Sequence, residues 1–197
     1  MLVLASSSPR RSELLRQWGY RFELVYAPIS ESLTEGVSPI DGVRNLAERK
    51  ALSGYQAWKS NGGSPQDLIL AADTIVVLGE RILGKPGDEK EAFEMLKALS
   101  GQTHRVMTGI ALATEIDKRV QIDSAVDVTT VTFREISDQE ILDYIASGEP
   151  MDKAAAYAIQ GEGGKFVIGV QGSVTNVIGL PMELLTDKLS QKGVFPV

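Results

Sequence analysis

An early stretch of the chain, "LVLASSSPRRSELL", joins an apolar run to three serines, a proline and two adjacent arginines. Leu2–Leu4 predict a short buried strand, and Ser8 as N-cap with Pro9 as first residue predicts a helix. Arg10 and Arg11 then fall in its first turn, where the helix dipole disfavours each cation by roughly 0.3–1 kcal/mol. They are either solvated arginines covering apolar surface with their stems, or part of an anion site suited to a phosphate chain.

Two further charged residues stand where the pattern favours apolar ones. Lys50 falls on the apolar stripe of a helix expected over "SPIDGVRNLAERKALSGYQAW", and it either snorkels to solvent or points inward at an anion. Asp73 interrupts "LILAADTIVVL", which we interpret as a pair of apolar strands. A buried carboxylate there costs several kcal/mol unless it is paired. Asp73 is therefore a structural residue bonded to backbone N–H groups, a metal ligand or a general base.

A tight turn links this region to a lysine. The dipeptide "GE" after Leu78 suits a two-residue hairpin turn with glycine first. The following strand would fold back along the one that carries Asp73. This brings Lys85, in "ILGKPG", toward the same place, although a lone lysine of this kind is usually a loop residue.

The stretch "EPMDKAAAYAIQGEGG" gathers polar side chains before a run of glycines. Glu149, Asp152, Lys153, Tyr157 and Gln160 cluster here. No phosphate-loop pattern is present, so we expect the glycines to form a flexible connection near a site. The amide of Gln160 can donate and accept together, which suits the imide edge of a uracil or thymine ring.

Composition narrows the chemistry. The 197 residues are 43% hydrophobic and 23% charged, with a net charge of −6, no cysteine and one histidine, His104. The negative charge disfavours nucleic-acid binding. The missing cysteines and single histidine leave oxygen ligands for any metal, which favours magnesium or manganese. His104 is most simply a satisfied histidine at a strand start, and we assign it no catalysis.

The chain has no apolar run near the roughly 18 residues of a membrane span, and its N-terminus lacks the order of a signal peptide. We therefore expect a cytoplasmic protein with no membrane partner.

The elements that must position these residues alternate between strands and helices. Further strands are expected over 22–26, 103–114 and 124–133, a hairpin over "GGKFVIGVQGS", and helices over 88–101, 137–148 and 179–193. A turn near Asp117 should join the two long strands. Paired hairpins within an α/β pattern predict a mixed sheet rather than a purely parallel one.

Several short motifs, in order over nearly the whole chain, resemble the Maf family of nucleoside triphosphate pyrophosphatases. Each is weak alone, but together they are highly specific. They are S-x-S-P-R-R from Ser6, E-R-K-A from Glu48, A-D-T from Ala72, G-K-P from Gly84, S-G-x-x-H from Ser100, T-x-V-x-F from Thr129, E-P-x-D-K-A from Glu149, I-Q-G from Ile159 and N-V-x-G-L-P from Asn176.

The resemblance implies a single Maf-like domain over residues 1–197. Its fold would be a mixed twisted β-sheet with helices in two lobes around a central cleft, related to the inosine-triphosphatase-like fold. The implied activity is hydrolysis of a nucleoside triphosphate to the monophosphate and pyrophosphate. The "DKAxAYxIQGxGG" form is similar to the branch that prefers dTTP and UTP, rather than the branch that acts on 7-methyl-GTP. The resemblance also implies a homodimer.

Family roles carry over to matching residues. Ser6, Arg10, Arg11, Lys50 and Lys85 would contact phosphates, with the two lysines among the catalytic groups. Glu31 and Asp73 would hold a divalent cation, Mg or Mn, or position water. Gln160 would select the base, and we place Lys153 beside it in the substrate-binding set.

Two residues depart from the family pattern, which usually has glycine in place of Ala155 and an aromatic residue in place of Val174. The extra methyl of Ala155 bears on base preference rather than on the chemistry. The family is also linked to arrest of septum formation, so the alternative function is a nucleotide-binding regulator of cell division acting through protein contacts. Such a regulator would not need Asp73 and Glu31 together.

Overall fold

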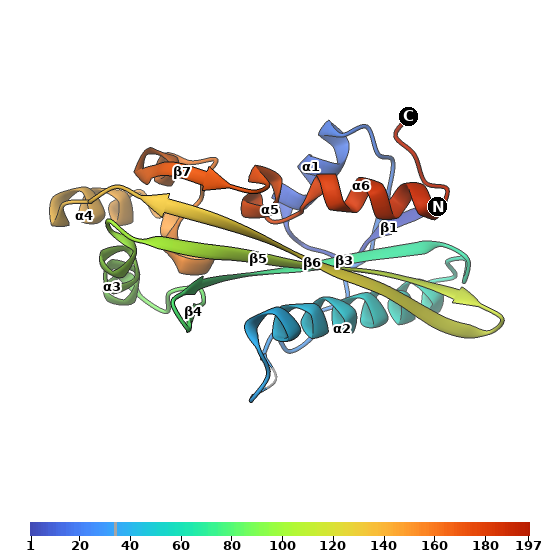
Figure 1. The fold of residues 1–197 in the computed structure, drawn as a ribbon. Helices are drawn as coiled ribbons and strands as arrows, with labels where there is room; N and C mark the ends of the chain where they lie inside the picture. Colours follow the sequence, from blue (N-terminus) through green and yellow to red (C-terminus); the bar gives the residue numbers. More distant parts are fainter. Residues whose placement is uncertain (34) are drawn as a thin grey trace. The chain divides into compact units, whose positions relative to one another are not determined.

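The computed structural model describes residues 1–33 and 35–197, and contacts divide them into two compact units (Figure 1). The first unit contains Met1–Asp73, Thr108–Asp127 and Gly179–Val197, and the second contains Thr74–Met107 and Val128–Ile178. The chain passes from one unit to the other within its long strands. Each unit is described below by itself.

The described strands form one seven-stranded sheet in the order β2-β1-β3-β5-β6-β7, with β4 paired to β3. β1 runs parallel to β2 and β3, whereas β4 is antiparallel to β3 and β7 is antiparallel to β6. The sheet is therefore mixed, as the sequence predicts. The strands are β1 (Leu2–Leu4), β2 (Glu23–Leu24), β3 (Leu68–Leu78), β4 (Arg81–Leu83), β5 (Thr103–Ile116), β6 (Arg119–Phe133) and β7 (Val167–Gln171).

Both predicted hairpin turns are present, and their backbone angles explain them. Asp117 and Lys118 have φ values of 52° and 62°, which is the type I′ pattern that matches the twist of β5 and β6. Gly79, with φ of 61°, opens the turn between β3 and β4.

The α-helices are α1 (Pro9–Gln17), α2 (Pro39–Ser60), α3 (Glu89–Leu99), α4 (Asp138–Ala146), α5 (Val174–Ile178) and α6 (Met182–Gln191). Three begin directly after the first residue of their predicted range: the side chains of Ser38, Asp88 and Ser137 each cap a helix by accepting a hydrogen bond from a first-turn backbone N–H. Ser8 has the extended backbone of an N-cap before α1, but its side chain makes no capping bond.

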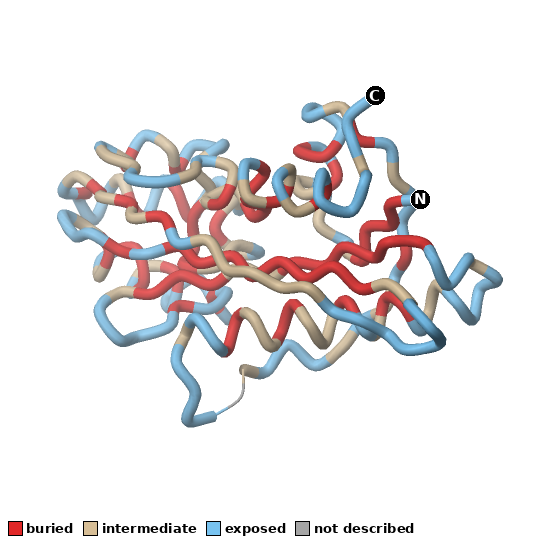
Figure 2. The backbone as a smooth tube through the Cα atoms, turned by 45° about the vertical axis from the view of Figure 1, so that its right-hand side comes forward, coloured by how far each residue is buried: buried red, intermediate tan, exposed pale blue. Residues whose placement is uncertain are grey.

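In the first unit, α2 covers one face of the sheet and α1 and α6 cover the other (Figure 1). Buried apolar residues of α2, β1, β3 and β5, among them the small Ala47, Ala51, Ala71 and Ala111, form the core beneath α2. Gly54 allows this close approach, because a Cβ at that position would lie 2.5 Å from Cβ of Ala5. Figure 2 shows the burial that results, with red segments along the strands and red alternating with paler segments on the helix.

In the second unit, α3, α4 and three short 3-10 turns enclose a core of larger side chains. The turns are Glu149–Asp152, Ala154–Ala156 and Glu162–Phe166. His104, Phe133 and Tyr157 pack edge to face, with centroid separations of 4.8–5.4 Å. His104 Nε2 lies 2.7 Å from Tyr157 Oη, whereas its buried Nδ1 has no hydrogen-bond partner among the described residues, so this histidine is buried but only partly satisfied.

Three details of the sequence interpretation were wrong. The strand expected over 22–26 is only two residues long, because it pairs with the short β1 alone. "LILAADTIVVL" forms one continuous strand, β3, rather than two. "GGKFVIGVQGS" forms no hairpin: its first part is a 3-10 turn, and its second is β7, which pairs with β6.

Within the described residues, no helix is both long enough and apolar enough to cross a membrane.

Candidate active site

The periodicities of a strand and a helix bring Lys50 and Asp73 together. Asp73 follows Ile69 and Ala71 at alternate positions of β3, on the face that packs against α2. Lys50 lies on the stripe of α2 that faces this strand. Its ammonium donates a hydrogen bond to Asp73 Oδ1 at 2.6 Å, and the two side chains are only 14% and 13% exposed. Lys50 therefore points inward and does not snorkel.

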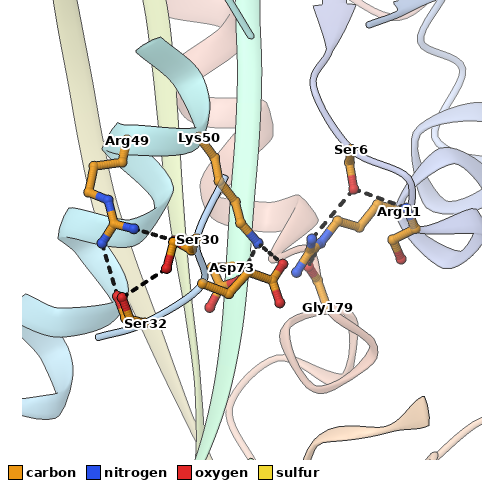
Figure 3. A network of polar contacts seen from close by, with 10 residues as sticks. Ser6, Arg11, Ser30, Ser32, Arg49, Lys50, Asp73 and Gly179 are labelled. Atoms are coloured by element: carbon orange, nitrogen blue, oxygen red, sulfur yellow. Dashed lines mark hydrogen bonds and ion pairs between the residues drawn. The ribbon is translucent and has the colours of Figure 1, made fainter. Parts of the chain in front are cut away.

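The same ammonium also contacts a second carboxylate. Lys50 Nζ lies 2.8 Å from Oε1 of Glu31, whose side chain is 59% exposed. One cation thus stands between a buried and an open carboxylate, and Figure 3 shows the Lys50 ammonium directed at Asp73. All three are among the predicted site residues, and the structure brings the two carboxylates within hydrogen-bond distance of the Lys50 ammonium.

The loop that carries Glu31 is held by a residue that the sequence analysis did not single out. Arg49 precedes Lys50 on α2 and donates from Nη1 to the Ser32 carbonyl at 3.0 Å and from Nη2 to the Ser30 carbonyl. The guanidinium thus binds the carbonyls of Ser30 and Ser32 (Figure 3), which are the sequence neighbours of Glu31. Its place in the E-R-K-A motif, directly before Lys50, could have drawn attention to it.

Arg11 lies close to this group at the start of α1. Its Nε donates to the Gly179 carbonyl at 2.8 Å, and its Nη1 lies 3.5 Å from Ser6 Oγ (Figure 3). Burial lowers the pKa of Arg11 and outweighs the attraction of Asp73, while the adjacent Arg10 lowers this pKa further. Arg11 is consequently fixed in a partly desolvated position and is not a freely solvated side chain.

Arg10 and Ser6 offer hydrogen-bonding groups beside it. Arg10 Nε is buried and has no hydrogen-bond partner among the residues that the structure describes. Such a nitrogen has lost its hydrogen bonds to water and has gained none from the protein in exchange, which is energetically unfavourable. Ser6 Oγ accepts the backbone N–H of Ser8 at 3.1 Å and so is held at the strand-to-helix turn. This turn thus carries an unsatisfied guanidinium nitrogen next to a fixed hydroxyl.

Lys85, Lys153 and Gln160 belong to the second unit. Lys85 is exposed and lies two residues beyond β4. The carbonyl of its neighbour Gly84 accepts the backbone N–H of Ala155 at 3.0 Å, so the segments that carry the two lysines are joined. Lys153 Nζ contacts the Glu149 carbonyl at 3.3 Å and the Asp152 carboxylate. Gln160 is exposed, in a turn that closes with Gly161 N donating to the Ala158 carbonyl at 3.2 Å.

The departure at Ala155 has a visible conformational cost. Ala155 and Ala156 have φ values of 55° and 60°, in the left-handed region that glycine enters freely and alanine does not. A glycine in place of Ala155 would relieve this strain. Both alanines are fully buried, so packing holds the strained conformation in place.

The glycine run does not form the flexible connection that we expected. The carboxylate of Glu149 accepts the backbone N–H groups of Glu162 at 3.1 Å and Gly163 at 3.2 Å, and it also accepts the hydroxyl of Tyr144. A Cβ on Gly161 would lie 1.8 Å from Glu149 Oε1. The glycines therefore permit close packing around a carboxylate.

No set of three His, Cys, Asp or Glu side chains within residues 1–33 and 35–197 could by itself hold a metal ion. Asp73 and Glu31 are two carboxylates that already share one cation, the Lys50 ammonium. Magnesium is commonly bound by one or two carboxylates together with phosphate oxygens of a substrate. The donor set thus fits a cation that arrives with a phosphate ligand.

Comparison with known proteins extends these observations. A model of the Maf-like protein family matches residues 1–192. A protein of Desulfitobacterium hafniense named dTTP/UTP pyrophosphatase is 53% identical over 98% of this chain and 86% of its own length. A protein with the same name from Yersinia pestis is 48% identical over 98% of this chain and 95% of its own length. Another from Pelotomaculum thermopropionicum is 44% identical over 98% of this chain and 96% of its own length. A crystal structure of a Vibrio cholerae protein aligns with a TM-score of 0.31 and 9% identity, over 75% of this chain and 76% of that one.

Proposed function

Because this chain belongs to the Maf-like protein family, we propose that it is a nucleoside triphosphate pyrophosphatase that hydrolyses dTTP and UTP. In this reaction a water oxygen bonds to the α-phosphorus, the bond from that phosphorus to the α,β-bridging oxygen breaks, and pyrophosphate leaves. The names of relatives at 43–53% identity support this substrate class. They do not favour the alternative of a cell-division regulator.

The observation that carries the proposal is the position of the Lys50 ammonium between the carboxylates of Asp73 and Glu31. Arg10, whose buried Nε has no hydrogen-bond partner among the described residues, and Arg11 stand at the neighbouring strand-to-helix turn. A triphosphate with its counter-cation would satisfy both features, since it brings phosphate oxygens to the guanidinium groups and positive charge to the carboxylates. Arginines at a helix N-terminus then become favourable, because the anion reverses the sign of the local interaction.

We assign each group of the first unit one role. Ser6, Arg10 and Arg11 bind phosphate oxygens, and Lys50 stabilises the negative charge that grows on them during hydrolysis. Asp73 and Glu31 would hold Mg²⁺ or Mn²⁺, which supplies Lewis-acid stabilisation of phosphate charge when it is bound.

In the second unit we assign Lys85 to phosphate binding and catalysis, Lys153 to substrate binding, and Gln160 to base selection. The hydrogen bond between Gly84 and Ala155 supports the first two assignments, because it couples the segments that carry both lysines. The exposed amide of Gln160 supports the third.

Replacement of Asp73 tests the proposal. Asp73→Asn keeps the shape of the side chain but removes its charge, so the fold should remain while turnover of UTP and dTTP falls about 100-fold or more. Turnover is measured by phosphate release with added inorganic pyrophosphatase, in Mg²⁺ and in Mn²⁺. Asp187→Asn, at an exposed position of α6, is the control and should act like the unchanged protein.

Two results would contradict these assignments. Wild-type turnover in the Asp73→Asn protein would remove Asp73 from the mechanism. No release from any nucleotide by the unchanged protein would overturn the pyrophosphatase proposal and favour the regulator.

Three broader expectations also remain proposals: a single domain over 1–197, a cytoplasmic location and a homodimer. The family match across residues 1–192 supports the first. Sedimentation showing only a species near 21.3 kDa at micromolar protein would contradict the homodimer.

A further inference from the structure

We propose that Glu149 and Tyr144 form a clamp that sets the position of the base-selecting Gln160, so that they determine nucleobase discrimination without touching the substrate. The proposal rests on the function proposed above and deepens it. Both are positioning residues, and neither belongs to the phosphate or metal groups already assigned.

The clamp fastens the two ends of the segment that carries Gln160. At one end, the backbone N–H of Ala158 donates to Tyr144 Oη at 3.2 Å. At the other end, the N–H groups of Glu162 and Gly163 donate to the two oxygens of Glu149 at 3.1 and 3.2 Å. Gln160 lies midway between these anchors, in the turn at residues 159–160.

The two anchors are coupled to each other. Tyr144 Oη accepts from Ala158 and donates its own proton to Glu149 Oε2, so one continuous hydrogen-bond chain runs from one end of the segment to the other. Hydrogen bonds from Tyr144 and from the backbone hold the pKa of Glu149 below its usual value against the effect of burial. The ionised carboxylate therefore remains the acceptor at neutral pH.

The surrounding residues leave the clamp little freedom. Tyr144 is fully buried on α4, and its ring packs edge to face against Phe166 with centroids 5.3 Å apart. A Cβ on Gly161 would lie 1.8 Å from Glu149 Oε1, and one on Gly163 would lie 2.6 Å from Tyr144 Oη. The glycines thus let the backbone close directly onto the two polar groups.

Such an arrangement matters for discrimination more than for phosphate chemistry. A base is read by paired donors and acceptors, and an amide displaced by a fraction of an ångström no longer favours the correct pattern over the wrong one. Loosening the 158–163 segment should therefore lower the preference for UTP over CTP. The phosphate and metal groups assigned in the first unit are far from this segment in the sequence and would be unchanged.

The test compares Glu149→Gln with Glu162→Gln. Each removes one carboxylate at the start of a 3-10 turn of the second unit, but the side chain of Glu162 is exposed and only its backbone N–H takes part in the clamp. In Glu149→Gln we expect the ratio of kcat/KM for UTP to that for CTP to fall about tenfold, with the Mg²⁺ concentration for half-maximal rate unchanged. Backbone amides of Glu162 and Gly163 should also exchange hydrogen faster. The control should show none of these changes.

Tyr144→Phe keeps the test decisive if Glu149→Gln does not fold. It removes one hydroxyl from the buried ring, and we expect a fall of about threefold or more in the same ratio. An unchanged UTP-to-CTP ratio in a folded Glu149→Gln or Tyr144→Phe protein overturns the clamp while the pyrophosphatase proposal stands. If the unchanged protein hydrolyses no nucleotide, both proposals fall.

Discussion

At the scale of the residue, the exposed amide of Gln160 predicts which nucleobase the site prefers. An amide can pair with both the carbonyl and the N3–H of uracil or thymine, whereas a carboxylate only accepts. Gln160→Glu should therefore lower kcat/KM for UTP about tenfold or more, because it leaves the base carbonyl without a donor. Steady-state rates over a panel of triphosphates provide the measurement, with UTP and dTTP expected above CTP and ATP for the unchanged protein.

The control for this variant is Gln171→Glu, which makes the same charge change at an exposed position of β7. It should leave the substrate order intact. If a purine or 7-methyl-GTP outranks UTP by tenfold, about 1.4 kcal/mol in transition-state binding, the role of Gln160 and the dTTP/UTP preference are both wrong.

Single residues were predictable from the sequence where they broke a pattern. Lys50 and Asp73 stood out as charges in apolar stripes, and they form an ion pair. Arg49 broke no pattern, because an arginine on a helix is ordinary, and Glu149 stood out only as one of several clustered polar residues. Their roles depend on which backbone groups lie beside them in space, and a single sequence does not carry that information.

At the scale of the element, α2 contacts one strand and one loop of the site through two neighbouring side chains. Lys50 reaches the β3 carboxylate, while Arg49 reaches the carbonyls on either side of Glu31. Arg49→Ala should free this loop, lower turnover about 10- to 100-fold and raise the Mg²⁺ concentration needed for half-maximal rate. Arg49→Lys keeps the charge but lacks the planar guanidinium that reaches both carbonyls. Its turnover rate should therefore lie between those of the wild-type and Arg49→Ala proteins.

A matched control for this prediction lies on the same helix. Gln56→Ala changes an exposed position of α2 and should leave both the rate and the Mg²⁺ requirement as they are. Titration of activity with Mg²⁺ measures both quantities for each variant. An Arg49→Ala protein with the wild-type Mg²⁺ requirement would mean that Glu31 does not need this support.

Helices were predicted better than irregular segments, and the reason is local chemistry. Ser38, Asp88 and Ser137 signalled helix starts because a capping side chain and its N–H partner are neighbours in the sequence. The segment after Gly161 was misjudged as flexible because its order comes from Glu149, more than ten residues away along the chain. Long-range partners of this kind decide whether glycines are mobile or tightly packed.

At the scale of the whole molecule, the α/β class and the mixed sheet followed from the alternation of strand and helix patterns, and family membership followed from the motifs. The positions within β3, β5 and β6 at which the chain passes from one compact unit to the other did not follow from the sequence. A long strand has the same pattern of apolar residues whether it packs in one core or in two. The predicted site residues accordingly belong to both units, and the boundary in β3 falls directly after Asp73.

Global stability should depend on pH through the chain's single histidine. Burial lowers the pKa of His104 to about 4, whereas an unfolded chain would have a value near 6.5. Above pH 6.5 the imidazole is neutral in both the folded and the unfolded chain, so it adds no pH dependence to the unfolding free energy. Between pH 6.5 and 4 the unfolded chain binds a proton that the native state refuses, so the native state loses stability as pH falls.

Carboxylates contribute to acid sensitivity at lower pH. Hydrogen bonds from Arg134 and the backbone of Ser137 lower the pKa of Glu140 to about 2, so its contribution is lost only below its unfolded value of 4.5. From pH 7.5 to 5.0 the loss should therefore come mainly from His104, at about 2 kcal/mol of unfolding free energy. Urea unfolding at these two pH values measures this loss of unfolding free energy.

His104→Gln should remove most of the difference, even if it lowers stability at both pH values. Tyr157→Phe removes the hydroxyl 2.7 Å from the ring but keeps the buried imidazole, so it should retain the pH dependence. Equal pH dependence in the wild-type and His104→Gln proteins would show that the imidazole titrates normally in the folded chain.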